Sequence, residues 1–301
     1  MQLPDPLRAM QLLQQGFARH NAGDLAGAEA LYREALRLAP TQTDALQLLG
    51  LVRRRRGDAG EAERLMRRSL DLNPQQPAVW NNLGNTLDDL GRGAEALAAF
   101  DRAVALAPAY ADALYNRARL LVTLGRLDEA RAALARATAA GPPTAAMLQL
   151  QARIETEAGR LDAALATLDA ALARFPERAA LHHNRAVLLH RLHRHAESLQ
   201  AHARAAQLGE DSADAHYNRG NTLQALGRPQ EAITAYRNAL QRDPSHALAL
   251  YDIARLRWRL GEADFEADLT AAGAADPASP VAPGILGHLR WRAERYADAA
   301  E

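Results

Sequence analysis

Glycine recurs every 34 residues along most of this 301-residue chain. The series is Gly23, Gly57, Gly91, Gly125, Gly159, Gly227 and Gly261, with His193 in its one gap. Proline keeps the same interval at Pro40, Pro74, Pro108, Pro142, Pro176 and Pro244, with Glu210 at the missing place. Alanine keeps it at Ala28, Ala62, Ala96, Ala130, Ala164 and Ala232, with Ser198 as the exception. A fixed period of this length predicts a solenoid of stacked helical repeats.

Composition limits the classes of function that such a chain can have. Apolar residues make up 48% of it but aromatic residues only 5%, so small side chains allow helices to pack closely. The 36 basic and 36 acidic residues cancel, which argues against general nucleic-acid binding. Because cysteine is absent, disulfides and thiolate metal sites are excluded. All basic residues except histidine are arginine, which together with abundant alanine suggests a GC-rich bacterial genome.

The sequence shows neither a secretory signal at its N-terminus nor a membrane-spanning stretch. The first ten residues lack the basic and then apolar run of a secretory signal. No stretch is apolar over the roughly 18 residues that a membrane span requires. We therefore expect a cytoplasmic protein without a membrane partner.

Apolar residues recur twice at helical steps between two prolines of one repeat. The first set is Trp80, Leu83, Gly84 and Leu87, and the second is Ala96, Phe100 and Ala103. Pro77 suits the first turn of a helix, Gly91 the left-handed residue that ends it, and Pro108 the end of a second helix. We expect an antiparallel helix pair whose crossing lies at Gly84 and Ala96. One pair cannot bury both of its faces, so neighbouring pairs must stack on it.

These residues, at these spacings, resemble the tetratricopeptide repeat family. The seventh repeat carries the equivalent set Gly220, Leu223, Gly227, Ala232, Tyr236, Ala239 and Pro244. The resemblance covers almost the whole chain. It implies an all-α fold, a right-handed α-solenoid or superhelix of about eight to nine 34-residue helix-turn-helix repeats. In this family the first helix of each repeat lines a concave groove.

The period places all repeats in a single solenoid over residues 1–301. The repeats start near Ala9, Thr43, Pro77, Ala111, Ala145, Ala179, Ala213, Ala247 and Pro280. The eighth repeat is degenerate, because Glu266 replaces the crossing alanine, and it is one residue short. The ninth is truncated at Glu301 within its second helix, which favours a chain cut from a longer protein over an array that ends raggedly.

Asparagine marks the expected groove. The family resemblance implies that the sixth residue of each first helix faces the groove, and this residue is asparagine in four repeats. These are Asn82, Asn116, Asn184 and Asn218, with Asn85 and Asn221 about one helical turn further on. An amide both donates and accepts, so such a ladder can hold an extended peptide backbone. The superhelical domains of O-linked N-acetylglucosamine transferase-like proteins are similar in this respect. Alternatively, these side chains bond neighbouring helices or stand on a solvated face.

An aromatic or histidine ring precedes three of these asparagines. The motif is Tyr115-Asn116-Arg117, His183-Asn184-Arg185 and Tyr217-Asn218-Arg219. Rings at Tyr115, His183 and Tyr217 would offer a flat, hydrogen-bonding contact to a ligand. The alternative is packing against the next repeat.

Histidine is concentrated in the sixth repeat. Six of the chain's ten histidines lie there: His182, His183, His190, His193, His195 and His202. His182 and His202 occupy the places of Trp80 and Phe100, so we expect them to pack together, and we expect no metal site. The cluster also suggests a pH-sensitive joint, because imidazole titrates near neutrality.

The motifs favour binding over catalysis. No phosphate-binding glycine loop, cysteine nucleophile or serine triad is present, so we expect neither enzymatic activity nor a cofactor in this chain. The expected function is a protein-interaction scaffold that binds an extended peptide or protein segment in the concave groove. The alternative is an N-terminal substrate-recruiting arm of a larger glycosyltransferase, sulfotransferase or 2-oxoglutarate/iron oxygenase. The chain would be a monomer, or a homo-oligomer that forms through its uncapped C-terminal repeat.

Overall fold

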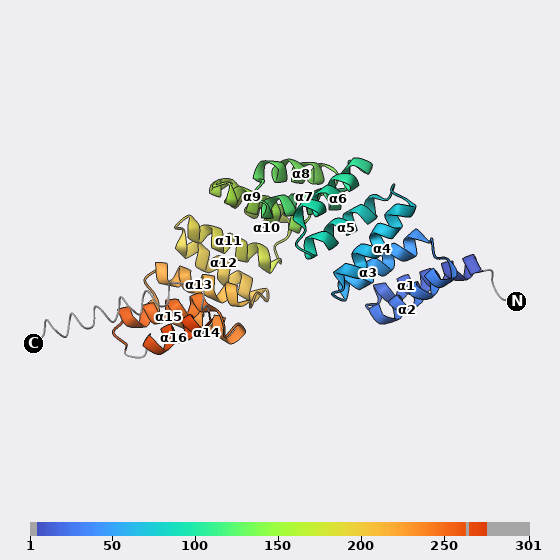
Figure 1. Ribbon diagram of the computed structural model, residues 1–301. Helices are drawn as coiled ribbons and strands as arrows, with labels where there is room; N and C mark the ends of the chain where they lie inside the picture. Colours follow the sequence, from blue (N-terminus) through green and yellow to red (C-terminus); the bar gives the residue numbers. More distant parts are fainter. Residues whose placement is uncertain (1–4, 263–264, 276–301) are drawn as a thin grey trace, which may run out of the picture. The chain divides into compact units, whose positions relative to one another are not determined.

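The protein is all-α in the residues that its computed structural model describes, 5–262 and 265–275 (Figure 1). These residues divide into two compact units, with the division between Ala158 and Gly159. The N-terminal unit holds α1 (Asp5–Asn21), α2 (Leu25–Leu38), α3 (Thr43–Arg55), α4 (Ala59–Leu72), α5 (Pro77–Asp89), α6 (Gly93–Leu106), α7 (Ala111–Thr123), α8 (Leu127–Ala139) and α9 (Ala145–Glu157). The C-terminal unit holds α10 (Leu161–Arg174), α11 (Ala179–Arg191), α12 (His195–Gln207), α13 (Ala213–Ala225), α14 (Pro229–Arg242), α15 (Ala247–Arg259) and α16 (Phe265–Ala275).

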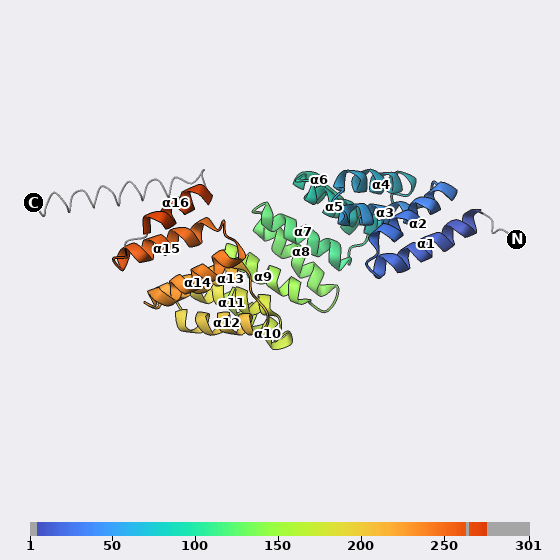
Figure 2. The same cartoon turned by 90° about the horizontal axis from the view of Figure 1, so that it is seen from below.

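The helices alternate between the first and the second helix of each repeat. Odd-numbered helices from α3 to α15 begin at the residues where the period places the repeat starts, from Thr43 to Ala247. Within a compact unit, each helix packs against the next one in the chain, and consecutive first helices such as α5 and α7 also touch (Figures 1 and 2). The division between the compact units falls in the turn of the fifth repeat, after α9.

A left-handed residue makes the tight turn inside the hairpins. Gly91, for example, has a φ of 73° and ends α5, as expected for a residue without a Cβ. His193 takes the same conformation in the sixth repeat, with a φ of 58°. The hairpin of α11 and α12 therefore keeps the common turn although it lacks the glycine.

A glycine in the first helix makes room for a large side chain of the second helix. A Cβ added to Gly84 would lie 2.5 Å from Cε1 of Phe100, and one added to Gly220 would lie 2.3 Å from Cε1 of Tyr236. Phe100 and Tyr236 are fully buried. These contacts confirm that Gly84 lies where the two helices cross.

Alanine replaces this glycine where the facing residue is smaller. The same 16-residue register pairs Ala118 with Leu134 and Ala186 with His202 in the sequence. All four of these side chains are buried. In these hairpins the larger first-helix residue thus goes with the smaller second-helix residue.

The sixth repeat departs from the expected histidine packing. His182 does take the place of Trp80: its Nε2 lies 2.9 Å from the carbonyl of Pro176, as Trp80 Nε1 lies 2.9 Å from that of Pro74. The expected contact between His182 and His202 is wrong, because His202 lies inside the hairpin. Its ring packs edge-on against His183, with centroids 5.8 Å apart.

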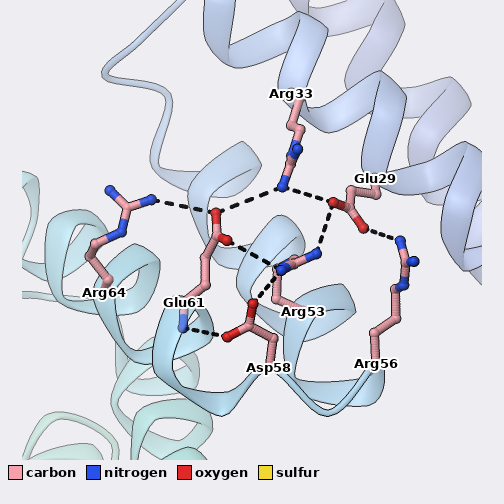
Figure 3. Close-up of polar contacts among 7 residues, drawn as sticks. All are labelled: Glu29, Arg33, Arg53, Arg56, Asp58, Glu61 and Arg64. Carbon is pink, nitrogen blue, oxygen red and sulfur yellow. Dashed lines mark hydrogen bonds and ion pairs between the residues drawn. The ribbon is translucent and has the colours of Figure 1, made fainter.

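A buried glutamate joins the first two repeats. Glu29 on α2 is 7% exposed and forms ion pairs with Arg33, Arg53 and Arg56 (Figure 3). Its Oε1 lies 2.9 Å from Arg33 Nη2 and 3.1 Å from Arg53 Nη1. Arg53 of α3 also pairs with Asp58, whose carboxylate accepts the Glu61 backbone N–H and caps α4 (Figure 3). One guanidinium therefore links three successive helices.

The buried residues of α16 are shifted by one position within the eighth repeat. Its buried second-helix residues are Leu269 and Ala272, each one position earlier than the register of Phe100 and Ala103 requires. The side chain of Glu266 and the ninth repeat, expected from Pro280, lie outside the described residues.

Candidate functional surface

The candidate surface is the row of first helices in each compact unit. We call the residues at the sixth and ninth positions of these helices the first-helix face. In the N-terminal unit they are Gln14, Phe17, Leu48, Leu51, Asn82, Asn85, Asn116, Arg119, Leu150 and Arg153. In the C-terminal unit they are Asn184, Val187, Asn218, Asn221, Asp252 and Arg255. Most are half-exposed, in contrast to the buried residues at the eighth position.

The first-helix face is hollowed between α1 and α3. The hollow has a volume of about 370 Å³ and takes its walls from Leu13, Gln14, Phe17, Asp44, Gln47 and Leu48. Gln14, Phe17 and Leu48 occupy the positions that carry Asn82 and Asn85 on α5. The side expected to bind a partner is thus concave at this place in the N-terminal unit.

Two members of the predicted site link neighbouring repeats. Asn116 Nδ2 donates to Oδ1 of the buried Asn81 at 3.0 Å, from α7 to α5. Tyr217 on α13 donates its hydroxyl proton to Asp252 on α15 at 2.9 Å. Both bonds join the fifth position of one repeat to the sixth position of the next. For these residues the structure shows a contact between helices, which was the alternative to ligand binding.

A polar network surrounds Asp252. Its carboxylate also pairs with Arg255 at 2.7 Å, and the residue is 6% exposed. Burial raises the pKa of Asp252, while the charge of Arg255 opposes that rise. Burial also raises the pKa of Tyr217 to about 12, so its hydroxyl stays protonated and able to donate.

Asn221 supports the core of the seventh repeat. Its Oδ1 accepts the hydroxyl of the buried Tyr236 at 2.7 Å. Without this acceptor, a buried hydroxyl would lose its best-placed partner. Asn221 therefore has a packing role whether or not it touches a ligand.

Four amides of the predicted site remain unpaired. Asn82, Asn85, Asn184 and Asn218 are half-exposed, and their side-chain amides have no hydrogen-bond partner among residues 5–262 and 265–275. The Asn82 and Asn218 carbonyls accept Thr86 and Thr222 hydroxyls, but these are backbone contacts. Four amide groups are therefore free to bind in the described structure.

The remaining two predicted residues are held by packing. Tyr115 is half-buried and lies against the hydrophobic core of the N-terminal unit. His183 packs on His202, and its Nδ1 is buried without a hydrogen-bond partner. Burial lowers the pKa of His183, so the ring is neutral near pH 7.

Sequence reasoning missed the hollow and its apolar residues. Leu13, Phe17 and Leu48 were not singled out because apolar residues at helical spacing are normally assigned to the core. The signal was available, since Phe17 and Leu48 stand at the ninth and sixth positions, where the family resemblance places the groove. Asp252 could have been found in the same way, since it follows Asn218 by 34 residues.

Two other site types were searched for in the described part of the chain. Among those residues, no group of three or more histidine, aspartate or glutamate side chains is arranged to hold a metal ion. Nor is any helix there both long and apolar enough to cross a membrane.

Several tetratricopeptide repeat models match the sequence, and together they extend over most of it. One matches residues 19–85, 53–102 and 89–154, a second matches 150–215 and a third matches 213–246. No curated protein matches the chain significantly in sequence.

Solved structures share the fold at low sequence identity. A tetratricopeptide repeat protein from Parabacteroides merdae matches with a TM-score of 0.67 and 19% identity, over 84% of this chain and 99% of its own. The Cut9–Hcn1 hetero-tetramer of the APC/C matches with a TM-score of 0.67 and 18% identity, over 88% of this chain and 52% of its own. MamA matches with a TM-score of 0.50 and 24% identity, over 55% of this chain and 96% of its own. The repeat period, the hairpin geometry and these matches lead to one conclusion: the chain belongs to the tetratricopeptide repeat family.

Proposed function

We propose that the chain is a protein-interaction scaffold that binds an extended peptide or protein segment along its first-helix face. The observation that carries this proposal is the recurrence of unpaired amides on the first-helix face of both compact units. Asn82 and Asn85 supply them in the N-terminal unit, and Asn184 and Asn218 in the C-terminal unit. Asn82 and Asn85 lie one turn apart on α5, and Asn184 and Asn218 lie on the successive first helices α11 and α13. Amides repeated in this way suit a ligand that repeats its own donors and acceptors, which is a property of an extended peptide backbone.

Helix packing makes this surface largely preformed. The side chains beside the free amides are fixed by contacts between repeats, such as Asn116 on Asn81 and Tyr217 on Asp252. A preformed surface loses little conformational entropy on binding, so modest contacts can yield measurable affinity. Asn116, Tyr217 and Asn221 support the surface in this proposal, and the four free amides make the contacts.

The test compares amides on the first helices of two hairpins with amides on the second helices of the same hairpins. Asn184→Ala with Asn218→Ala removes two free amides from α11 and α13. Gln200→Ala with Gln241→Ala is the matched control, because it removes exposed amides from α12 and α14 of the same repeats. Each variant is immobilised as the full chain. Partners are then captured from an extract of the cells in which the natural protein is expressed.

The proposal predicts partner loss in the first variant alone. Two hydrogen bonds of about 1 kcal/mol each correspond to an affinity loss of roughly 30-fold. The helical signal should stay unchanged in both variants, since neither pair of side chains is buried. Equal recovery of the same partners by both variants would count against the first-helix face.

A further inference from the structure

We propose that the hollow between α1 and α3 receives a bulky apolar side chain of the bound segment, next to a basic residue of that segment. This inference rests on the proposed function and specifies which segments the face selects. It assigns an anchor site to the N-terminal unit, in addition to the amides that hold the peptide backbone.

The hollow has apolar walls that no part of the described chain covers. Leu13, Phe17 and Leu48 line it, and the Phe17 side chain is 51% exposed. Met10, 48% exposed, lies one turn before Leu13 on the same side of α1. Exposed aromatic and aliphatic side chains around a concavity are typical of interaction sites. A volume of about 370 Å³ lies within the range of ligand-binding pockets.

The rim of the hollow carries a single charge. Asp44 is the one charged residue among its walls, and it is exposed. It makes no ion pair with any residue of the described ranges. The other polar residues of the walls, Gln14 and Gln47, are neutral amides. An unpaired carboxylate beside an apolar hollow favours a segment that places a lysine or arginine next to its apolar anchor.

The free amides of α5 lie one helix further along the same row. α3 contacts both α1 and α5 within the N-terminal unit. A segment anchored between α1 and α3 can therefore continue over Asn82 and Asn85. Amides that bind a peptide backbone do not distinguish side chains, so the hollow supplies the selectivity that they lack.

The test begins with a phage-displayed library of random dodecapeptides, selected on the immobilised full chain. We expect the enriched sequences to carry leucine, methionine or phenylalanine within two residues of lysine or arginine. The strongest binder is then synthesised with a fluorescein label, together with a version in which glutamine replaces the basic residue. Fluorescence anisotropy measures the affinity of both peptides for the variants.

Three variants separate the anchor from other effects. Phe17→Ala should weaken binding by about tenfold, as expected for loss of an aromatic contact. Leu72→Ala is its control, because this exposed side chain lies on α4, a second helix of the same compact unit, and it should leave the affinity unchanged. Asp44→Asn should reduce affinity about threefold for the basic peptide and leave it unchanged for the glutamine peptide.

Each other outcome identifies what has failed. Suppose that the peptides bind the Phe17→Ala variant with the same affinity as the natural chain, but bind the double variant Asn82→Ala, Asn85→Ala more weakly. This result would overturn the anchor site and leave the proposed function standing. Enriched peptides without a basic residue, or an equal effect of Asp44→Asn on both labelled peptides, would overturn the charge selection. If no peptide is enriched and Phe17→Ala instead abolishes self-association in light scattering, a second copy occupies the hollow and the inference is wrong.

Discussion

Gly84 and Phe100 fit together so closely that no Cβ can stand between them. The Cβ of an alanine at residue 84 would lie 2.5 Å from Cε1 and 2.7 Å from Cδ1 of the phenylalanine ring. Both residues are buried, so the ring has no open space into which it can turn. The register of α5 against α6 is set at this contact.

Gly84→Ala should therefore destabilise the protein. Overpacking of this kind lowers the unfolding free energy by about 1–3 kcal/mol. This loss exceeds the gain that alanine brings over glycine in helix propensity. Adding Phe100→Leu should recover part of the loss, because the chain itself pairs Ala118 with Leu134 in this register. Urea unfolding of the single and double variants measures both effects. A double variant less stable than the sum of its parts would contradict the size matching.

His193→Gly should stabilise the chain. A left-handed conformation costs a residue with a Cβ about 1–2 kcal/mol, and His193 has a φ of 58°. Glycine loses more backbone entropy on folding, so the expected net gain is about 1 kcal/mol. Gly227→His at the equivalent turn, where φ is 71°, should destabilise by a similar amount. Thermal unfolding of the two variants should shift in opposite directions; a shift in the same direction would be inconsistent with this account.

Acid should weaken the sixth repeat. Burial, followed by the nearby His183, Arg219 and His190, lowers the pKa of His202 to about 3. The unfolded chain, with a histidine pKa of about 6.5, then binds more protons than the folded chain. Stability from this group is complete above pH 6.5 and falls as the pH drops towards 3, with a loss of about 2 kcal/mol at pH 5.

His202→Leu is the matched variant for this pH dependence. Leucine pairs with alanine at this position in the fourth repeat, so it suits Ala186. Unfolding free energies at pH 8 and pH 5 should differ less in this variant than in the natural chain. His183 and His190, whose pKa values burial also lowers, account for a remaining dependence. An unchanged difference would mean that His202 does not cause the acid sensitivity.

Glu29→Gln should cost more stability than the same change at an exposed ion pair. Glu29 is buried among Arg33, Arg53 and Arg56, so losing its charge leaves these guanidinium groups without their shared partner (Figure 3). The expected loss is about 2 kcal/mol. Glu129→Gln is the control, because Glu129 pairs with Arg126 on the surface, where a salt bridge contributes less than about 1 kcal/mol. Urea unfolding at pH 7 compares them, and equal losses would contradict the role of burial.

The repeat architecture could be predicted because every repeat packs the same pair of helices in the same way, so the same residue types recur at the same positions. The period of Gly23 and its successors located the turns, and the steps from Trp80 to Phe100 located the buried faces. The sequence also predicts a shortened eighth repeat, and the burial of Leu269 is consistent with a shift of one residue in its second helix. Local rules of helix termination and small-residue contact go far here, because within each compact unit every helix packs against the next one in the chain.

The functional surface could be predicted only in part, because asparagine side chains on it either bond a neighbouring helix or remain free for a ligand. Asn82 and Asn116 occupy equivalent positions, yet Asn116 bonds Asn81 and Asn82 remains free. The fifth residue of the preceding repeat is an amide in both cases, Gln47 before Asn82 and Asn81 before Asn116, so the sequence does not tell which asparagine is engaged. His202 shows the same limit, since its partner His183 lies on the other helix and its depth could not be read from spacing.

Cysteine accessibility tests the central claim, that partners bind the first-helix face, most directly. The chain has no cysteine, so a single one at Asn82→Cys or at Ala98→Cys reports one site alone. Asn82 lies on α5 and the exposed Ala98 on α6 of the same repeat. Maleimide labelling is timed with and without the partner captured by the natural chain. Binding should slow labelling at residue 82 and leave residue 98 unchanged; protection at residue 98 with free labelling at residue 82 would place the partner on the second helices and contradict the account.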